Sequence, residues 1–251
     1  MVSSSSDIEV IGHEGGGTAP GNTLTAIQQG LDGGADVIEI DVHLTSDGHL
    51  ITCHEAADHS IEVSGCPVEE QPLSNLQDVY PEAYLPEAYH DEDVLLIRDL
   101  LTDTLKGVPL ILDVKNALLP PDTSDDLLDS LLELTDLDAW DENVCVASFD
   151  HKLLYKLKKH RPEVRLGMTS GSNSLLQREE LDRLSPDIWL MHWRYAGVGA
   201  VELTEQRGVK LFPWVINKKP LAMKALSVGV NGVVTDHPKR IRETIQSFQS
   251  G

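Results

Sequence analysis

Eight short apolar runs alternate with eight amphipathic segments along the chain, and this alternation is the strongest constraint on its fold. The apolar runs have the length of buried strands, at residues 8–12, 37–45, 110–115, 144–149, 164–168, 188–192, 209–216 and 232–235. The segments with helical periodicity are residues 22–33, 93–105, 124–137, 150–160, 175–184, 198–207, 219–228 and 239–248. Strands that alternate with helices form parallel sheets. Eight such pairs in 251 residues predict an α/β fold, the (β/α)8 TIM barrel.

An open, doubly wound sheet is the alternative, but its first strand is usually followed by GxGxxG, and "GHEGGG" at residues 12–17 does not have that spacing. The regular alternation of strands and helices is interrupted after the second strand. A turn signal at Asp47-Gly48 and the alternating "HLITC" predict a hairpin arm after it. Residues from about 55 to 93 are rich in proline and acid and show no clean period. We expect a single domain over residues 1–251, with this insertion covering one end of the barrel.

The chain is strongly acidic, with 41 Asp and Glu against 20 Lys and Arg and a formal net charge of −21. Such a surface repels nucleic acid and anionic membranes, so we expect neither nucleic-acid binding nor stable membrane association. It also repels anionic substrates, so a phosphate site must be locally positive or hold a metal ion. Scattered acid of this kind is typical of proteins from salt-loving microbes and also of ordinary acidic cytosolic proteins, and the sequence is compatible with both.

Cysteine usage and hydropathy predict a cytoplasmic protein. The three cysteines, Cys53, Cys66 and Cys145, form no CxxC pair and no even disulfide framework, which favours a reducing compartment. The first residues, "MVSSSSDIEV", have neither the basic nor the apolar region of a signal peptide. No run approaches the 18 apolar residues of a membrane span.

The run "VIEIDVHLT" places two carboxylates on one face of a strand, because Glu39 and Asp41 are two residues apart. Adjacent carboxylates repel each other and raise each other's pKa unless a cation joins them. A hard divalent cation, Mg²⁺ or Ca²⁺, would satisfy both. In the alternative interpretation, one of the pair faces the helices or pairs with an arginine.

The further candidates near these carboxylates are Asp113, Lys115, His13 and His54. In "LILDVKN", Asp113 and Lys115 share a strand face. They indicate either a salt bridge or a third metal ligand beside a phosphate-binding lysine, and active sites of barrels lie at such strand ends. His13 and His54 each end a strand close to the acidic runs. A lone histidine is usually structural, but two in these places suggest an acid and a base across a reacting centre.

An ordered series of motifs resembles the glycerophosphodiester phosphodiesterase family. The matching segments are "HEG", "PGNT", "GAD", "EIDV", "SDG", "HE", "DVK", "SFD", "WVIN" and "GVNGVVTDHP", in order from about residue 11 to 238. Each motif is weak alone, whereas the ordered series is specific. The resemblance implies the same (β/α)8 barrel and a small-molecule phosphodiester substrate.

The resemblance also implies residue roles. Glu39, Asp41 and Asp113 would bind a divalent metal, His13 and His54 would act as general acid and base, and Lys115 would contact the phosphate. Trp214 and Glu14 complete the set of expected substrate contacts. In the family, a neighbouring hydroxyl of the substrate attacks first, and water then opens the cyclic phosphate to give glycerol phosphate and an alcohol.

Departures from the family pattern cluster in the first loop. Glu14 replaces a phosphate-contacting arginine, and Gly21 replaces a glutamate in a loop about one residue shorter. Asp113 also replaces a glutamate, and Glu55 replaces an aspartate. Loss of the arginine removes a bidentate donor worth about 1.5–3 kcal/mol. Glu14 could turn away while Lys115 or another cation compensates, or it could add a metal ligand and change the ion or substrate.

Three functions follow. The surviving histidines and acids favour a working hydrolase with altered substrate preference. A catalytically silent barrel that binds a metal or ligand is the alternative, and a lyase-like relative of phospholipase D that releases cyclic phosphate is the second. Outside this set, Trp214 would line the substrate channel or pack in the core, and Asp236 would cap the helix that begins at Pro238. Trp193 and Arg194 end another strand, and either could face the site.

Overall fold

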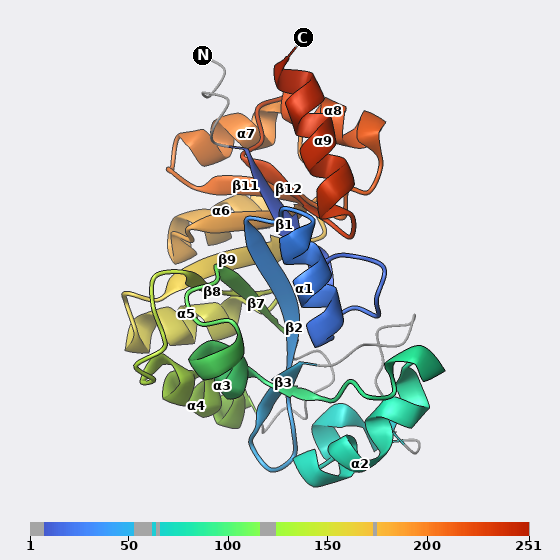
Figure 1. The fold of residues 1–251 in the computed structure, drawn as a ribbon. Coiled ribbons are helices and arrows are strands. Elements are labelled where there is room, and N and C mark those ends of the chain that lie inside the picture. The colour runs from blue at the N-terminus through green and yellow to red at the C-terminus, as the bar shows by residue number, and fades with distance from the viewer. Residues whose placement is uncertain (1–7, 53–61, 64–65, 116–123, 173–174, 251) are drawn as a thin grey trace.

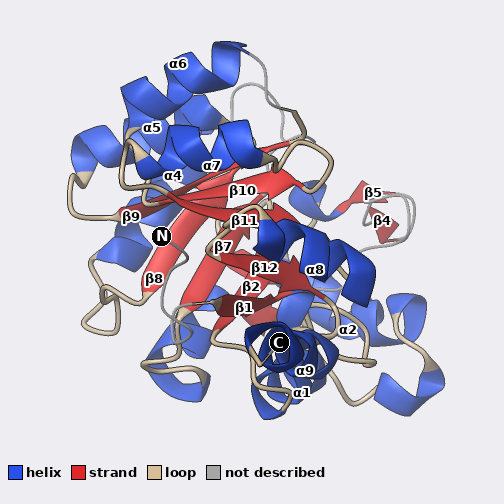
Figure 2. Ribbon diagram, turned by 90° about the horizontal axis from the view of Figure 1, so that it is seen from above, coloured by secondary structure: helices blue, strands red, loops and turns tan. Residues whose placement is uncertain are grey.

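The computed structural model describes residues 8–52, 62–63, 66–115, 124–172 and 175–250. It confirms the predicted barrel architecture, with parallel strands inside and helices outside (Figures 1 and 2). The eight strands of the barrel are β1 (Glu9–Gly12), β2 (Val37–Leu44), β7 (Leu110–Val114), β8 (Val144–Ser148), β9 (Arg165–Ser170), β10 (Ile188–His192), β11 (Lys210–Trp214) and β12 (Gly232–Thr235). The outer helices are α1 (Leu24–Asp32), α3 (Ile97–Asp99), α4 (Ser124–Thr135), α5 (His151–His160), α6 (Leu175–Leu184), α7 (Val198–Glu205), α8 (Lys219–Ser227) and α9 (Pro238–Gln249).

The strands follow the order β11-β10-β9-β8-β7-β2-β1-β12, and hydrogen-bonded ladders join each neighbouring pair. The two edge strands, β11 and β12, are joined differently. Their connection consists of backbone hydrogen bonds from Asn231 N to Leu211 O at 3.1 Å and from Ile216 N to Val234 O at 2.8 Å. The ring is therefore completed between β11 and β12 by bonds from flanking loop residues rather than by a strand ladder.

Alternation along each strand decides which side chains face the barrel interior. In β2, Ile38, Ile40 and Val42 belong to the large core between strands and helices, which leaves Glu39 and Asp41 on the opposite, inner face. One end of the barrel interior is filled by a second core, made of Ile11, Ile111, Cys145, Ala147, Ile188, Leu190, Phe212 and Val234. The barrel is thus packed at one end, and polar side chains occupy the interior at the carboxyl ends of the strands.

The helix expected at residues 93–105 is shorter than predicted. Leu95–Leu96 instead forms strand β6, which pairs antiparallel with β3 (Leu50–Thr52). The helical part is limited to α3 and a π-helical turn at Leu100–Thr104. Strand pairing by these apolar residues has overridden their helical periodicity, so the chain enters the helix only at Ile97.

The insertion after β2 begins with the expected hairpin arm, because β3 pairs antiparallel with β2 through His43 and Ile51. Beyond it lie the short strands β4 (Glu62–Val63) and β5 (Cys66–Pro67), and helix α2 (Leu73–Tyr84). Helix α2 was therefore not predicted, because its part of the sequence shows no clean helical period. A small core of its own supports this part of the chain, made of Ile51, Val68, Leu76, Leu85 and Val94. Figure 1 shows α2 beyond the carboxyl end of β2.

Among the described residues, every helix is too short or too polar to cross a membrane.

Candidate active site

A cavity of about 520 Å³ opens at the carboxyl ends of the barrel strands. Its lining joins residues that are far apart in the sequence: His13, Glu14, Glu39, Asp41, His43, Glu69, Asp113, Lys115, Phe149, Thr169, Leu190, Trp214, Val215 and Val234. The polar residues come mainly from β1, β2, β7 and the loops that follow them. The apolar and aromatic residues come from the strands on the other side, so the cavity has an acidic wall and an aromatic wall.

Three carboxylates meet on the acidic wall, as the sequence predicts. The parallel ladder between β2 and β7 sets Asp41 directly beside Asp113, and Glu39 lies one inward position earlier on β2. Each residue is at most 5 % exposed. One oxygen from each lies within 4.8 Å of the others, a spacing that allows one ion to contact all three. The cluster thus follows from strand register and alternation.

The charges of this cluster are only partly compensated. Burial and the neighbouring Asp41 carboxylate raise the pKa of Glu39 to about 8. Burial alone would also raise the pKa of Asp41, but the Lys115 ammonium holds it below its usual value. Lys115 Nζ lies 2.7 Å from Asp41 Oδ1 and 2.6 Å from Asp113 Oδ2. One lysine therefore bridges two of three buried carboxylates, while the third, Glu39, is still pushed toward its protonated form.

These features fit a hard divalent cation. The donors are all carboxylate oxygens, which Mg²⁺ and Ca²⁺ prefer. Burial of three acids against one lysine leaves an excess of negative charge that a cation would neutralise. Lys115 lies against the carboxylates, the contact that the salt-bridge interpretation expects, and it also lines the cavity.

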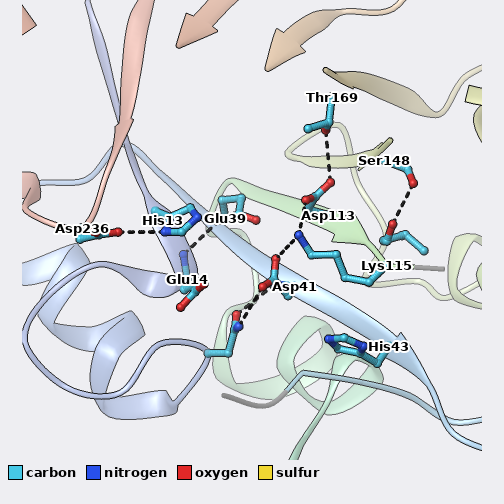
Figure 3. Close-up of polar contacts among 12 residues, drawn as sticks. His13, Glu14, Glu39, Asp41, His43, Asp113, Lys115, Ser148, Thr169 and Asp236 are labelled. Atoms are coloured by element: carbon cyan, nitrogen blue, oxygen red, sulfur yellow. Dashed lines mark hydrogen bonds and ion pairs between the residues drawn. The ribbon is translucent and has the colours of Figure 1, made fainter. Parts of the chain in front are cut away.

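His13 is held by a residue whose role the sequence did not reveal. His13 Nδ1 and Asp236 Oδ1 are 2.8 Å apart (Figure 3). Asn217 Nδ2 donates to the other oxygen of Asp236. Burial alone would lower the pKa of His13, but the bond to Asp236 and the charges of Glu39 and Glu14 raise it to about 10. The expectation that Asp236 caps the next helix is wrong, because the residue at that cap is His237.

Glu14 occupies a left-handed backbone conformation, with φ of 49° and ψ of 38°. Its backbone N–H donates to Glu39 Oε2 at 3.0 Å, so this loop residue helps to hold a carboxylate of the cluster. Its side chain lies over Gly21: a Cβ atom at that position would be 1.9 Å from Glu14 Oε2. The two departures from the family pattern at positions 14 and 21 are therefore in direct contact.

The insertion contributes a second buried pair to the cavity. His43 is the next inward residue of β2 after Asp41, and its Nδ1 lies 3.1 Å from Glu69 Oε1. Both side chains are about 5 % exposed or less. On the other flank, Thr169 donates its hydroxyl to Asp113 Oδ1 at 3.2 Å. The expected second histidine, His54, lies outside the described residues, as does Glu55.

The aromatic wall is centred on Trp214, which lines the cavity as the channel interpretation expects. Its ring meets Phe149 edge-on at 5.9 Å and His192 at 5.2 Å. The Trp214 indole N–H is buried and has no acceptor among the described residues. Arg194 does not line this cavity. Its guanidinium lies over the Trp193 ring at 5.4 Å, beside a separate hollow.

The sequence analysis did not predict several residues of the cavity lining, although the sequence contains a pattern that indicates most of them. His43 continues the two-residue alternation of Glu39 and Asp41. Phe149 follows Ala147 in the same way, since both occupy inward positions at the end of β8. The pairing of His43 with Glu69 has no comparable signal, because it depends on how the insertion folds back.

Comparisons with known proteins agree with this geometry. The model of the glycerophosphoryl diester phosphodiesterase family matches residues 13–240. A glycerophosphodiester phosphodiesterase of Caldanaerobacter subterraneus subsp. tengcongensis is 28 % identical over 240 residues, covering 92 % of this chain and 95 % of the relative. One of Bacillus altitudinis is 24 % identical, covering 95 % and 99 %.

Solved structures share the fold. A phosphodiesterase of Oleispira antarctica in complex with the product sn-glycerol-3-phosphate superposes with a TM-score of 0.82 at 23 % identity, over 96 % of this chain and 98 % of that one. Because the family match spans most of the chain and includes the loop of His13 and the acidic strands, the chain belongs to the glycerophosphoryl diester phosphodiesterase family, whose members are phosphoric diester hydrolases.

Proposed function

We propose that this protein hydrolyses glycerophosphodiesters to glycerol phosphate and an alcohol, with a divalent cation, Mg²⁺ or Ca²⁺, bound by Glu39, Asp41 and Asp113. The observation that carries the proposal is the cluster of three buried carboxylates beside His13 and Lys115 in one cavity of a family member. The product bound to the Oleispira antarctica relative supports a small phosphodiester as the substrate.

The cation would neutralise charge on the phosphoryl oxygens as it develops in the transition state. Lys115 would donate its third N–H to a phosphate oxygen, since an ammonium carries three donors and the carboxylates of Asp41 and Asp113 engage two of them. The carboxylates hold the pKa of Lys115 well above its usual value against the effect of burial, so this positive charge persists at neutral pH.

The contacts of His13 support a role in proton transfer. Its Nδ1 is engaged by Asp236, so the ring has a fixed orientation and its other nitrogen is left for the reacting group. We propose that His13 is one partner of the acid–base pair and His54 the other, that the neighbouring hydroxyl of the substrate attacks first, and that water then opens the cyclic phosphate. Trp214 and Glu14 would contact the substrate from the aromatic wall and the first loop.

Glu14 is the basis of two alternatives to a hydrolase. A carboxylate where the family pattern has an arginine would weaken phosphate binding, so the chain could bind a cation without turnover. If the second step is slow, it would release cyclic phosphate, as a lyase does. Both alternatives share the cation site with the hydrolase and differ only in what happens to the substrate.

The test is a screen of purified protein against glycerophosphodiesters with different alcohols, each with Mg²⁺ or Ca²⁺, at low and high salt, followed by phosphorus NMR. We expect glycerol phosphate as the final product, only with a divalent ion, and a loss of about 10²–10⁴-fold in kcat for His13→Ala. Cyclic phosphate that accumulates would support the lyase. Metal binding by calorimetry with no product from any diester would refute the hydrolase.

A further inference from the structure

A second hollow lies between the loop that follows β10 and helix α8, and it shares no lining residue with the catalytic cavity. The loop lines it with residues 193–197, and the helix lines it from the other side. Its volume is about 230 Å³, and most of its lining is apolar. Pockets for drug-sized ligands begin at about 300 Å³, so this hollow suits a smaller molecule.

The hollow results from the spacing of residues along α8 and from short side chains. Four lining residues have the spacing of one helix face: Leu221, Lys224, Ala225 and Val228. The side chains of Ala225 and Ala196 are too short to fill the space between this face and the loop. Trp193, Leu221 and Val228 are half-buried and pack against the main core. The apolar lining is therefore anchored to the fold.

Two cations at the hollow have no carboxylate partner. Arg194 and Lys224 both line it and are exposed, and neither forms an ion pair with a residue that the structure describes. The described lining contains no Asp or Glu, although the chain has a net charge of −21. The Arg194 guanidinium lies over the Trp193 ring, 5.4 Å from its centroid. An apolar pocket with a few charged groups is typical of a small-molecule site, and these charges select an anion.

The hollow and the catalytic cavity are separated by a thin wall. Of two consecutive residues, Val215 lines the cavity and Ile216 lines the hollow. The backbone N–H of Trp193 donates to Trp214 O at 3.1 Å. The Trp193 ring stacks on His192 with centroids 5.6 Å apart, and His192 meets the Trp214 ring edge-on at 5.2 Å. A molecule seated against Trp193 is therefore two ring contacts away from the catalytic cavity.

We infer that this hollow is an effector site for a small carboxylate with a compact apolar body. The body packs against Trp193 and the face of α8, and the carboxylate contacts Arg194 and Lys224. Occupancy of the hollow changes ligand affinity in the catalytic cavity through the contacts of Trp193 with His192 and of His192 with Trp214. The effect on turnover rests on the proposed function, whereas binding of the carboxylate does not.

Binding is tested first, by NMR titration with chelator present. Benzoate should bind at least about ten-fold more tightly than acetate, which lacks the apolar body, and about three-fold more tightly than benzamide, which lacks the charge. Arg194→Gln and Lys224→Gln should each weaken benzoate binding about two- to five-fold. Ala196→Leu should weaken it at least about ten-fold by filling the hollow, and the two charge variants decide the result if this variant fails to fold.

Lys219→Gln is the matched control for Lys224→Gln. Lys219 is also exposed on α8 and forms no ion pair with a described residue, but it does not line the hollow. Benzoate should therefore bind this variant as it binds the wild type. Equal binding of acetate, benzamide and benzoate would overturn the site, and so would equal weakening by Lys219→Gln and Lys224→Gln.

The link to the catalytic cavity is tested next, in Mg²⁺. Saturating glycerol phosphate should change the Kd of benzoate at least about two-fold, and benzoate should change the Kd of glycerol phosphate by the same factor, because linkage is reciprocal. The KM for glycerophosphodiesters should shift with benzoate in the wild type and not in Ala196→Leu. Benzoate that binds without changing either Kd would overturn the effector role. If glycerol phosphate does not bind and no diester is turned over, the proposed function fails, while benzoate binding still decides whether the hollow is a carboxylate site.

Discussion

The two walls of the cavity are held in place by different means. The acidic wall is fixed by a strand ladder, which sets Asp41 beside Asp113, and by Lys115, which bridges both carboxylates. The aromatic wall has ring contacts among Phe149, His192 and Trp214 instead of ion pairs, and Phe149 is largely exposed.

This difference suggests a division of work. Rigid, buried charges suit the stabilisation of a transition state, which needs groups that do not reorganise. Exposed rings suit binding of a variable part of the substrate, because apolar contact is not directional. Changes to the acidic wall should therefore lower kcat, and changes to the aromatic wall should raise KM. The following variants test that contrast, beginning with the largest expected effect.

Asp113→Asn should lower kcat by at least about 10²–10³-fold, because it removes one of the three carboxylates proposed to bind the cation while preserving side-chain shape. Weaker binding of Mg²⁺ in calorimetry should accompany the loss. Asp182→Asn is the control, since Asp182 pairs with Arg207 at the exposed surface of α6. A kcat within a few-fold of wild type for Asp113→Asn would place the cation elsewhere.

Metal-free protein should lose stability as the pH rises. The pKa of His13 is 6.5 in an unfolded chain and about 10 in the fold, so its stabilising contribution is complete below pH 6.5 and is lost as the pH passes 10. Glu39, with a pKa raised to about 8, acts in the same direction at lower pH. A tenfold difference in proton affinity between the folded and unfolded states corresponds to about 1.4 kcal/mol, so the free energy of unfolding should fall by roughly a few kcal/mol.

Asp236→Asn should make this dependence shallower between pH 6.5 and 10, because the carboxylate that holds the proton on His13 is gone. Urea unfolding at several pH values, with chelator present, measures it. If the slope of the variant equals that of the wild type, Asp236 does not set the charge of His13.

Gly21→Ala should lower the free energy of unfolding by about 1–3 kcal/mol, because the new methyl group would overlap the Glu14 side chain. In a Glu14→Gly background the cost should nearly vanish, and glycine also suits the positive φ at position 14. Gly171→Ala is the control, since the space around Gly171 is open. Equal costs of Gly21→Ala in both backgrounds would show that the two positions are independent.

Trp214→Phe should raise KM by about two- to ten-fold, through loss of one hydrogen bond from the indole N–H to a substrate oxygen. Trp189→Phe is a matched comparison, because the Trp189 indole N–H donates to Ser170 Oγ at 2.8 Å inside the protein. That variant should lower stability without raising KM. A fall in kcat alone for Trp214→Phe would contradict the expectation that changes to the aromatic wall act on KM.

The acidic wall was the more predictable of the two. Glu39, Asp41 and Asp113 stand at alternating positions within apolar strands, so alternation alone assigns them to the barrel interior, and the order of the barrel brings their strands together. The aromatic wall could be predicted only in part. Trp214 belongs to a recognisable motif and Phe149 continues the alternation of Ala147, but no local pattern shows that the rings of Phe149, His192 and Trp214 meet.

Other features depended on contacts that no local pattern encodes. The bond between His13 and Asp236 joins the first strand to the last across 223 residues. An aspartate two residues before a proline at a helix start suggests a cap from local sequence, but Asp236 instead makes the tertiary contact with His13. The helix predicted at residues 93–105 lost its first residues to pairing with β3 for the same reason. Sequence periodicity thus located the elements, while long-range partners decided the details.

The contact between Glu14 and Gly21 restricts the order in which this loop can change during evolution. With Glu14 in its present position, a side chain at position 21 would occupy the same space, and a glutamate there would also repel the Glu14 carboxylate. A path to the present loop therefore passes through a glycine at position 21 before, or together with, the glutamate at position 14. Among relatives, the identity of residue 21 should consequently forecast which side chains residue 14 can carry.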